Sequence, residues 1–250
     1  MNFKIIYALW LRQIKKYLRS KPRMLGSLGQ PLLFLVALGF GLGPIYQKAG
    51  GGNYLDFLVP GIIAMTILFT AIFNGIDLIW DRRFGFLKET LVAPVSRLDV
   101  LIGRTMGGAT VAFFQGIIIL LITLLLGFRP ANLLLLLPAF VFMFLIGLLF
   151  TALGTAIATM LEDMNAFPVI INFVVMPIFF LSGALFPIES MPFAIKMIYY
   201  FNPLSYGVDG LRSTLVMTSH FGLGFDLAVI LGVIAIIFGI GTYLFSKIEV

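Results

Sequence analysis

The sequence predicts an all-α, polytopic membrane protein with six transmembrane helices. Hydrophobic residues make up 60% of its 250 residues and charged residues 11%, and the mean hydropathy is +1.08, which is well beyond the usage of soluble domains. Six stretches of 20 residues or more contain no Asp, Glu, Lys or Arg: 24–47, 57–76, 105–128, 130–161, 164–188 and 227–246. A helix of about 20 residues crosses the roughly 30 Å hydrocarbon core and pairs its own backbone groups there. We therefore expect one membrane domain, 1–250, with spans at 25–45, 55–79, 104–127, 133–160, 167–186 and 227–246.

Basic residues are distributed unevenly among the loops of this predicted topology. Of the 17 Lys and Arg residues, 13 fall before the first span, between the second span and the first residue of the third (Arg104 included), or after the last span. The positive-inside bias therefore predicts that both termini are cytoplasmic. The net charge of +6 is thus explained by topology, and nucleic-acid binding is not indicated.

Residues 1–23 predict an amphipathic helix at the membrane interface. Phe3, Tyr7, Trp10 and Ile14 recur at three- and four-residue spacing, with basic residues opposite. The helix could serve as an orientation signal or have a mechanical role, and the pattern favours neither. The apolar stretch that follows is too long for a signal-peptide core, so we expect it to be an anchor.

The longest cytoplasmic connection, between the second and third spans, predicts a second short amphipathic helix at 82–93. Apolar residues Phe84, Leu87 and Leu91 repeat at helical spacing, with Arg83 and Glu89 among them. Pro94 then interrupts the helix. This segment could be a linker on the lipid surface or a contact for a partner.

Small and polar residues within the predicted spans indicate helix packing. Gly103 and Gly107, and Gly147 and Thr151, lie four residues apart, a spacing that permits close helix contact. Asn172 predicts either a hydrogen bond between helices or a contact with a transported substrate.

Residues 187–225 predict short outer helices that dip into the membrane and return. Lys196, Asp209 and Arg212 divide this segment into pieces too short to cross. Asn202 and Pro203 fit the N-cap and first position of a helix.

The sequence contains few residues that could support catalysis or ion coupling. No predicted span carries a charge near its middle, there is no cysteine, His220 is the single histidine, and no G-x-x-x-x-G-K-[ST] motif occurs. We therefore expect neither an enzyme nor a chain that binds a metal or cofactor. An ATPase-independent secondary carrier or channel remains the alternative to a subunit driven by a separate ATPase.

Three blocks closely resemble the permeases of ABC type-2 exporters, in the same order and spacing. They are DRRFGFLKETLVAPVSR at 81–97, FLSGALFPIESMP at 180–192, and NPLSYGVDGLR at 202–212. With the six spans and the amphipathic N-terminus, the resemblance covers nearly the whole chain.

The resemblance implies a multi-pass permease of the prokaryotic plasma (inner) membrane. It would pair with a second permease chain, expected to be an identical copy, and with separate ATP-binding cassette ATPase subunits. ATP and magnesium would then be bound by the ATPase and not by this chain. The helix at 82–93 would be the coupling helix, and its ATPase contacts would be Arg83, Phe84, Leu87, Glu89 and Leu91. Tyr199, Tyr200 and Tyr206 would belong to an outer gate. The substrate would be hydrophobic or amphipathic (a drug, a lipid or a lipid-linked glycan) and would be moved outward by the permease, and membrane lipid would surround the chain.

Overall fold

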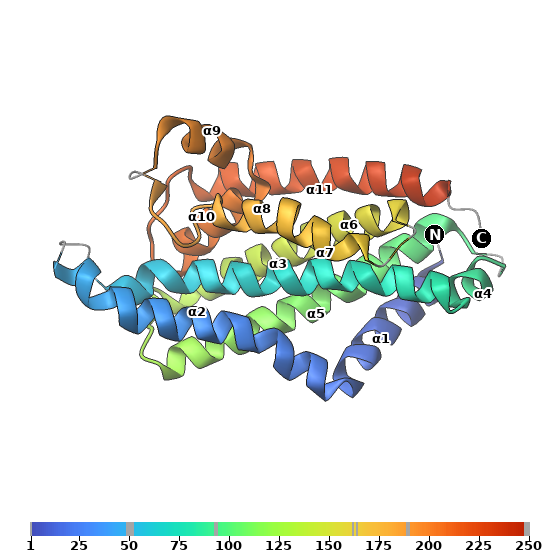
Figure 1. The fold of residues 1–250 in the computed structure, drawn as a ribbon, viewed down its shortest axis with the longest axis horizontal. Coiled ribbons are helices and arrows are strands. Elements are labelled where there is room, and N and C mark those ends of the chain that lie inside the picture. The colour runs from blue at the N-terminus through green and yellow to red at the C-terminus, as the bar shows by residue number, and fades with distance from the viewer. Residues whose placement is uncertain are drawn as a thin grey trace.

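The structure is a computed structural model that describes residues 2–48, 53–92, 95–161, 163, 165–188 and 191–247. Every regular element in these residues is a helix, and the helices form an elongated bundle (Figure 1), which confirms the all-α prediction. In chain order the elements are α1 (Phe3–Arg19), α2 (Lys21–Lys48), α3 (Tyr54–Arg83), α4 (Phe86–Val92), α5 (Arg97–Leu125), η1 (Leu133–Leu135), α6 (Leu136–Met160), α7 (Ala166–Ile170), η2 (Ile171–Val175), α8 (Met176–Phe180), α9 (Phe193–Phe201), α10 (Pro203–Leu215) and α11 (Leu223–Ser246).

Five helices in the described part of the chain are long and apolar enough to cross a membrane. They are α2, α3, α5, η1 continued by α6, and α11. These five helices cover the spans predicted at 25–45, 55–79, 104–127, 133–160 and 227–246 to within a few residues at most ends. Among the described residues, five of the six predicted spans therefore meet this length criterion, and a shorter apolar helix, Ala166–Phe180, stands in the place of the sixth.

The segment predicted as a span at 167–186 is shorter than expected. Its helix runs from α7 through the π-helical η2 to α8, Ala166–Phe180, and covers about 22 Å at 1.5 Å per residue. Pro177 supplies no backbone N–H and follows the π-helical η2, so the α-helical ladder is interrupted there, whereas Pro168 lies in the first turn and removes no intrahelical bond. The chain then turns, with Gly183 at φ +74°, a conformation that glycine adopts without strain.

Helix α3 lies at the centre of the bundle. In its most apolar stretch 83% of the residues are buried, against 11% in α2 and 17% in α11. Small residues allow the close packing around α3: a Cβ atom on Gly75 would lie 2.4 Å from the backbone of Gly154 in α6. The outer helices α2 and α11 consequently present most of their apolar side chains to the surroundings.

The small residues singled out in the sequence lie at helix contacts. A Cβ atom on Gly147 would lie 3.0 Å from the carbonyl oxygen of Ala109, where α6 packs on α5, and one on Gly107 would lie 2.7 Å from Gln13. Gly103 faces Ile6 in the same way. These glycines therefore permit close packing of α5 with α6 and with α1.

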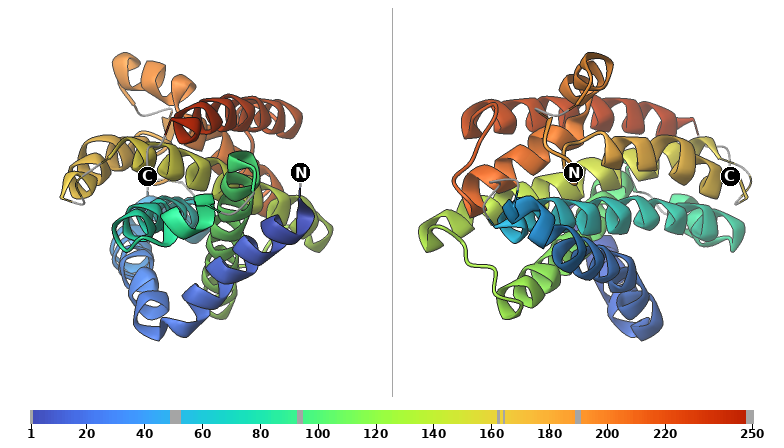
Figure 2. Two further views of the ribbon diagram at one scale, coloured as in Figure 1. Left: turned by 90° about the vertical axis from the view of Figure 1, so that its right-hand side faces the viewer. Right: turned by 60° about the vertical axis from the view of Figure 1, so that its left-hand side comes forward.

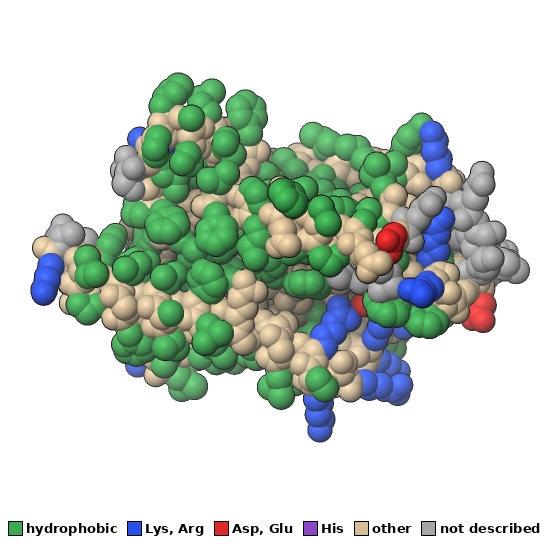
Figure 3. Space-filling view, viewed as in Figure 1, with side chains coloured by type: hydrophobic (Ala, Val, Ile, Leu, Met, Phe, Trp, Pro, Cys, Tyr) green, Lys and Arg blue, Asp and Glu red, His purple; other side chains and the backbone are tan. Residues whose placement is uncertain are grey.

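Helix α1 follows the outside of α5 (Figure 2). The side chain of Asn2 caps its N-terminus by accepting from the N–H of Lys4, and Trp10 donates its indole N–H to Thr110 at 3.0 Å. Both termini lie at the end of the bundle that also carries α4 (Figure 1), and we call this the terminal end. In Figure 3 Lys and Arg side chains gather towards this end, while hydrophobic side chains cover the middle.

The opposite end of the bundle, which we call the far end, carries α9 and α10. The side chain of Asn202 accepts from the N–H of Leu204 at 3.0 Å, and Pro203 occupies the first turn of α10, as the sequence predicted. The far-end connection between α5 and α6 joins α10 through a bond from Ala131 N–H to the Leu215 carbonyl, 2.9 Å. Helix α10 is thus fixed against the long helices, and it packs on α3, α6 and α11.

Candidate functional site

The helix predicted at 82–93 is divided by a glycine turn. Helix α3 continues to Arg83 and ends where Gly85 adopts φ +78°, and the seven-residue α4 begins at Phe86. Phe84, at the corner, is 73% exposed and stacks on Trp80 with their ring centroids 5.4 Å apart. An apolar side chain is therefore displayed at the terminal end of the molecule.

The predicted contact residues of this region do not all face outward. Arg83 and Glu89 are exposed, as Phe84 is, but Leu87 is only 1% exposed and packs into the hydrophobic core of its own chain. The side chain of Leu91 lies outside the described part of the structure. Leu87 therefore attaches α4 to the bundle, whereas Phe84, which the predicted spacing placed on the same face, lies outside α4 and is exposed.

A buried carboxylate joins three helices beside α4. Asp81, at the end of α3, is bound by both guanidinium nitrogens of Arg12 from α1, at 2.9 and 3.0 Å. Arg104 of α5 binds the same carboxylate and is itself only 4% exposed. The guanidinium carbon of Arg12 also lies 3.6 Å from the ring centroid of Phe86, the first residue of α4. Arg12 therefore connects the interface helix to both α3 and α4.

A second carboxylate lies one turn earlier on α3. Asp77 accepts from Arg23 of α2 at 3.1 Å and pairs with Lys16 of α1 at 3.2 Å. The other guanidinium nitrogen of Arg23 donates to Asn74, whose amide donates to the carbonyl of Gly108. The sequence reasoning missed both aspartates as functional residues and read the basic residues only as a topology signal. Two aspartates spaced four apart beside a basic loop were the available clue.

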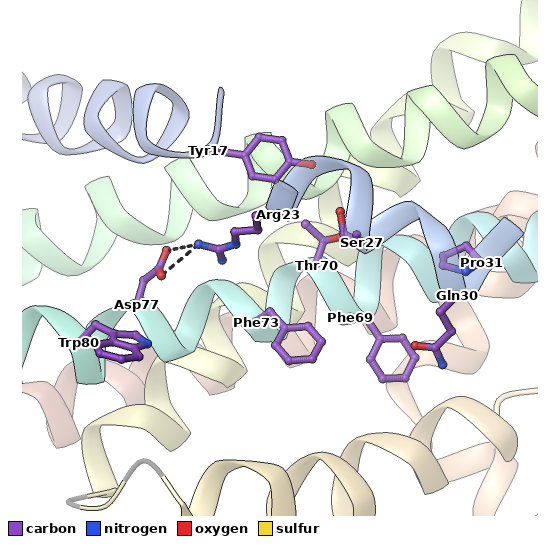
Figure 4. A pocket seen from close by; sticks show the side chains of 11 residues that line it. Tyr17, Arg23, Ser27, Gln30, Pro31, Phe69, Thr70, Phe73, Asp77 and Trp80 are labelled. Atoms are coloured by element: carbon purple, nitrogen blue, oxygen red, sulfur yellow. Dashed lines mark hydrogen bonds and ion pairs between the residues drawn. The ribbon is translucent and has the colours of Figure 1, made fainter. Parts of the chain in front are cut away.

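A cavity with a volume of about 570 Å³ opens between α2 and α3 (Figure 4). Its lining consists of Tyr17, Arg23, Gly26, Ser27, Gln30, Pro31, Phe69, Thr70, Phe73, Asp77 and Trp80. The Arg23–Asp77 pair lies towards one end, and Phe69, Pro31 and Gln30 lie towards the other (Figure 4). The cavity thus offers aromatic surface beside a charged pair.

Asn172 lies in η2 and is exposed on the surface of the single chain. Its neighbour Phe173 is 77% exposed. An amide in the middle of an apolar helix is unfavourable against hydrocarbon. A partner chain or a polar pathway on this face would satisfy it.

The tyrosines predicted at the outer gate gather at the far end. Tyr199 and Tyr206 are buried and Tyr200 is partly exposed, and the Tyr206 hydroxyl donates to the carbonyl of Tyr200 at 2.6 Å. Burial raises the pKa of the Tyr206 hydroxyl, which keeps this donor protonated. Phe221 stacks on Tyr199 and Tyr206 with centroid separations of 5.6 and 4.8 Å. The three tyrosines therefore form one aromatic cluster with the segment before α11.

In the ranges that the structure describes, no group of three or more His, Cys, Asp or Glu side chains could hold a metal ion. The arrangement instead combines apolar helices, a cavity of mixed character and an ion-pair network at one end.

A membrane-spanning, all-helical transport permease is the class of protein that this fold and its relatives define. The chain belongs to the ABC-2 type transporter family, which it matches over residues 5–216. The resemblance noted in the sequence is thus confirmed, and the family is one of transport permeases and not of catalytic enzymes.

Relatives cover most of the chain. The ycf38 protein of Cyanophora paradoxa, named as a transport permease, is 31% identical over 99% of this chain and 90% of its own length. Nodulation protein J of Rhizobium leguminosarum bv. viciae is 30% identical over 84% of this chain and 81% of its own. Nodulation protein J of Rhizobium meliloti strain 1021 is 28% identical over 86% and 84%.

Proposed function

We propose that this chain is the membrane subunit of an ATP-driven exporter in a prokaryotic inner membrane. The observation that carries the proposal is the terminal end of the bundle. There Leu87 is buried and attaches α4 to the bundle, while Phe84 is exposed beside α4. Arg12 of α1 contacts both α4, through Phe86, and α3, through Asp81. A short helix beside an exposed apolar side chain is typical of a surface that a partner protein covers.

The partner in this proposal is a separate ATP-binding cassette ATPase, which binds ATP and magnesium. Phe84 would enter an apolar pocket of the ATPase, while the exposed Arg83 and Glu89 would set its orientation at the rim. Leu87 would act indirectly, by holding α4 in place. The role of Leu91 remains a proposal from the resemblance.

Copurification tests the ATPase contact. The wild-type chain, solubilised from its own membranes, should retain an ATP-hydrolysing subunit. Phe84→Asp buries an unpaired carboxylate in the contact, and the loss of an anchor worth about 2 kcal/mol lowers affinity roughly 30-fold. Lys247→Ala, at the same end of the chain, is the control and should retain the ATPase. If no ATPase accompanies even the wild-type chain, an ATPase-independent carrier or channel becomes the better description.

The substrate in this proposal is hydrophobic or amphipathic and enters the cavity between α2 and α3. Phe69, Phe73 and Trp80 supply apolar surface for it, and Arg23 and Asp77 supply a polar end. Phe73→Ala should reduce export of such a substrate with ATPase retention unchanged, whereas Phe3→Ala, on an exposed face away from the cavity, should not.

The orientation in this proposal places the terminal end in the cytoplasm and the far end outside. It is supported by the basic residues gathered at the terminal end (Figure 3). Cysteines introduced singly at Lys196 and His220 should react with a membrane-impermeant thiol reagent in intact cells. Since the chain has no native cysteine, the background is clean. Labelling that requires cell lysis would reverse the orientation.

A further inference from the structure

Two buried carboxyl groups meet at the far end of the bundle. Asp209 of α10 is 3% exposed, and its oxygens accept from the N–H of His220, the N–H of Phe221 and the hydroxyl of Ser219, at 2.8 to 3.2 Å. Asp209 therefore fixes the loop 216–222, which precedes α11. The same loop carries Phe221, the centre of the aromatic cluster.

Asp226, in the first turn of α11, lies against Asp209 within hydrogen-bonding reach. It is 0% exposed, and neither of its oxygens has a hydrogen-bond partner when both aspartates are taken as ionised. An ionised carboxylate so placed would be dry, without a donor, and beside a like charge, and each of these conditions is unfavourable. The position at a helix N-terminus favours a negative charge, but this effect is the weaker one.

Among the residues that the structure describes, none of the other ionisable groups around the pair makes a hydrogen bond to the carboxyl oxygens of Asp226. On α10, Tyr206 donates to the Tyr200 carbonyl, and Arg212 donates to the Gly183 carbonyl and lies 4.1 Å from the ring centroid of Phe57 in α3. From the loop, His220 presents its backbone N–H to Asp209 and packs its ring against Tyr199. The neighbouring helix α6 contains no ionisable residue.

We propose that Asp209 and Asp226 form a proton-binding site, in which one proton shared by the two carboxyl groups at neutral pH holds the loop 216–222 closed over the far end. The proton makes Asp226 a donor and Asp209 an acceptor, which gives Asp226 the partner it otherwise lacks. The pair then carries one negative charge, and that charge is stabilised by the three donors on Asp209.

A proton suits this site better than a metal cation does. Sodium or calcium needs about six oxygen ligands, whereas the oxygens of Asp209 are already engaged by donors and Asp226 offers only two. A proton needs one donor oxygen and one acceptor. The chemistry of the pair therefore selects the smallest cation.

Loss of the proton would weaken the closure. Release to solvent, through the cavity of about 260 Å³ that Asp209 and Ser219 line, changes the pair from one negative charge to two. Repulsion would then separate α10 from the start of α11 and loosen the loop that Asp209 holds. Since this step rests on the proposed orientation, the pH that controls it is the pH outside the cell.

Infrared difference spectroscopy of the purified chain in lipid nanodiscs tests the shared proton. At neutral pH the wild type should show the carbonyl stretch of a protonated carboxylic acid, shifted in heavy water, and the band should disappear reversibly as the pH rises. Asp226→Asn should lack the band, and Asp163→Asn, in an exposed turn, should keep it. A wild type without this band overturns the proposal, as does a band that persists in Asp226→Asn.

Loop opening has its own measurement. Thr218→Cys in the loop should react faster with a thiol reagent as the pH rises, relative to Ala131→Cys on the neighbouring connection, which corrects for thiolate formation. Adding Asp226→Asn should remove the excess, since the amide supplies a permanent donor to Asp209. An equal pH response with and without Asp226→Asn contradicts the closure, and an effect of sodium at constant pH would point to a metal cation instead. Neither measurement involves the ATPase, so the result is independent of whether that partner is retained.

Discussion

Asp81 shows how a single residue organises the terminal end of the bundle. Its side chain is 5% exposed and receives Arg12 and Arg104 from two other helices. A buried carboxylate of this kind is tolerated because charged donors surround it. Removing it would leave Arg104 buried without its acid.

Asp81→Asn should therefore destabilise the chain strongly. Breaking a buried pair from one side costs about 3–5 kcal/mol, whereas Lys16→Ala removes a half-exposed partner of Asp77 and should cost about 0–1 kcal/mol. Thermal unfolding of the two variants in nanodiscs compares the costs directly. Equal unfolding temperatures would show that the Asp81 cluster does not stabilise the fold.

Gly75 allows a second test at the residue scale. A methyl group there would lie 2.4 Å from the backbone of Gly154, so Gly75→Ala should force α3 and α6 apart at a cost of about 1–3 kcal/mol. Gly41→Ala in α2 has no atom within 4 Å and should be neutral or slightly stabilising. If both alanines behave alike in thermal unfolding, the close packing of α3 on α6 is not as described.

At the scale of elements, the sequence predicted most accurately the features that depend on residues close together in the chain. Uninterrupted apolar length identified five long helices, and Asn202 with Pro203 identified the start of α10. Length alone failed at 167–186, because the π-helical segment before Pro177 and the turn at Gly183 shorten the helix although the composition remains apolar. Spacing also could not reveal that Leu87 packs inward, since an amphipathic pattern gives an apolar face without saying what covers it.

The link between α1 and α4 leads to a prediction about coupling. Arg12→Lys keeps a positive charge beside Asp81. It loses the bidentate hydrogen bonds to that carboxylate and the stacking of the guanidinium plane on the ring of Phe86. We expect the ATPase to remain bound while the substrate moved per ATP hydrolysed falls. Lys15→Arg on the same helix is the control. A normal ratio in Arg12→Lys would mean that α1 does not transmit motion from α4.

At the scale of the whole molecule, the exposed apolar helices suggest a second permease chain. The face around η2 displays Asn172 and Phe173, and α2 is mostly exposed. No sequence pattern within one chain could distinguish lipid from a partner on this face. Asn172→Cys should form a cross-linked dimer with a short thiol cross-linker in native membranes, whereas Ile236→Cys on α11 should not. If neither variant forms a cross-linked dimer, this face contacts lipid and not a second permease chain.

Docking of a separate ATPase at the terminal end of this chain is the central element of the proposed function. A photoreactive amino acid placed at Phe84 tests it most directly, with Tyr243 on α11 as an exposed aromatic control. On illumination in native membranes, position 84 should cross-link to a single cytoplasmic protein that binds ATP, and position 243 should not. Cross-linking of position 84 to lipid alone, with an active transporter, would contradict the account.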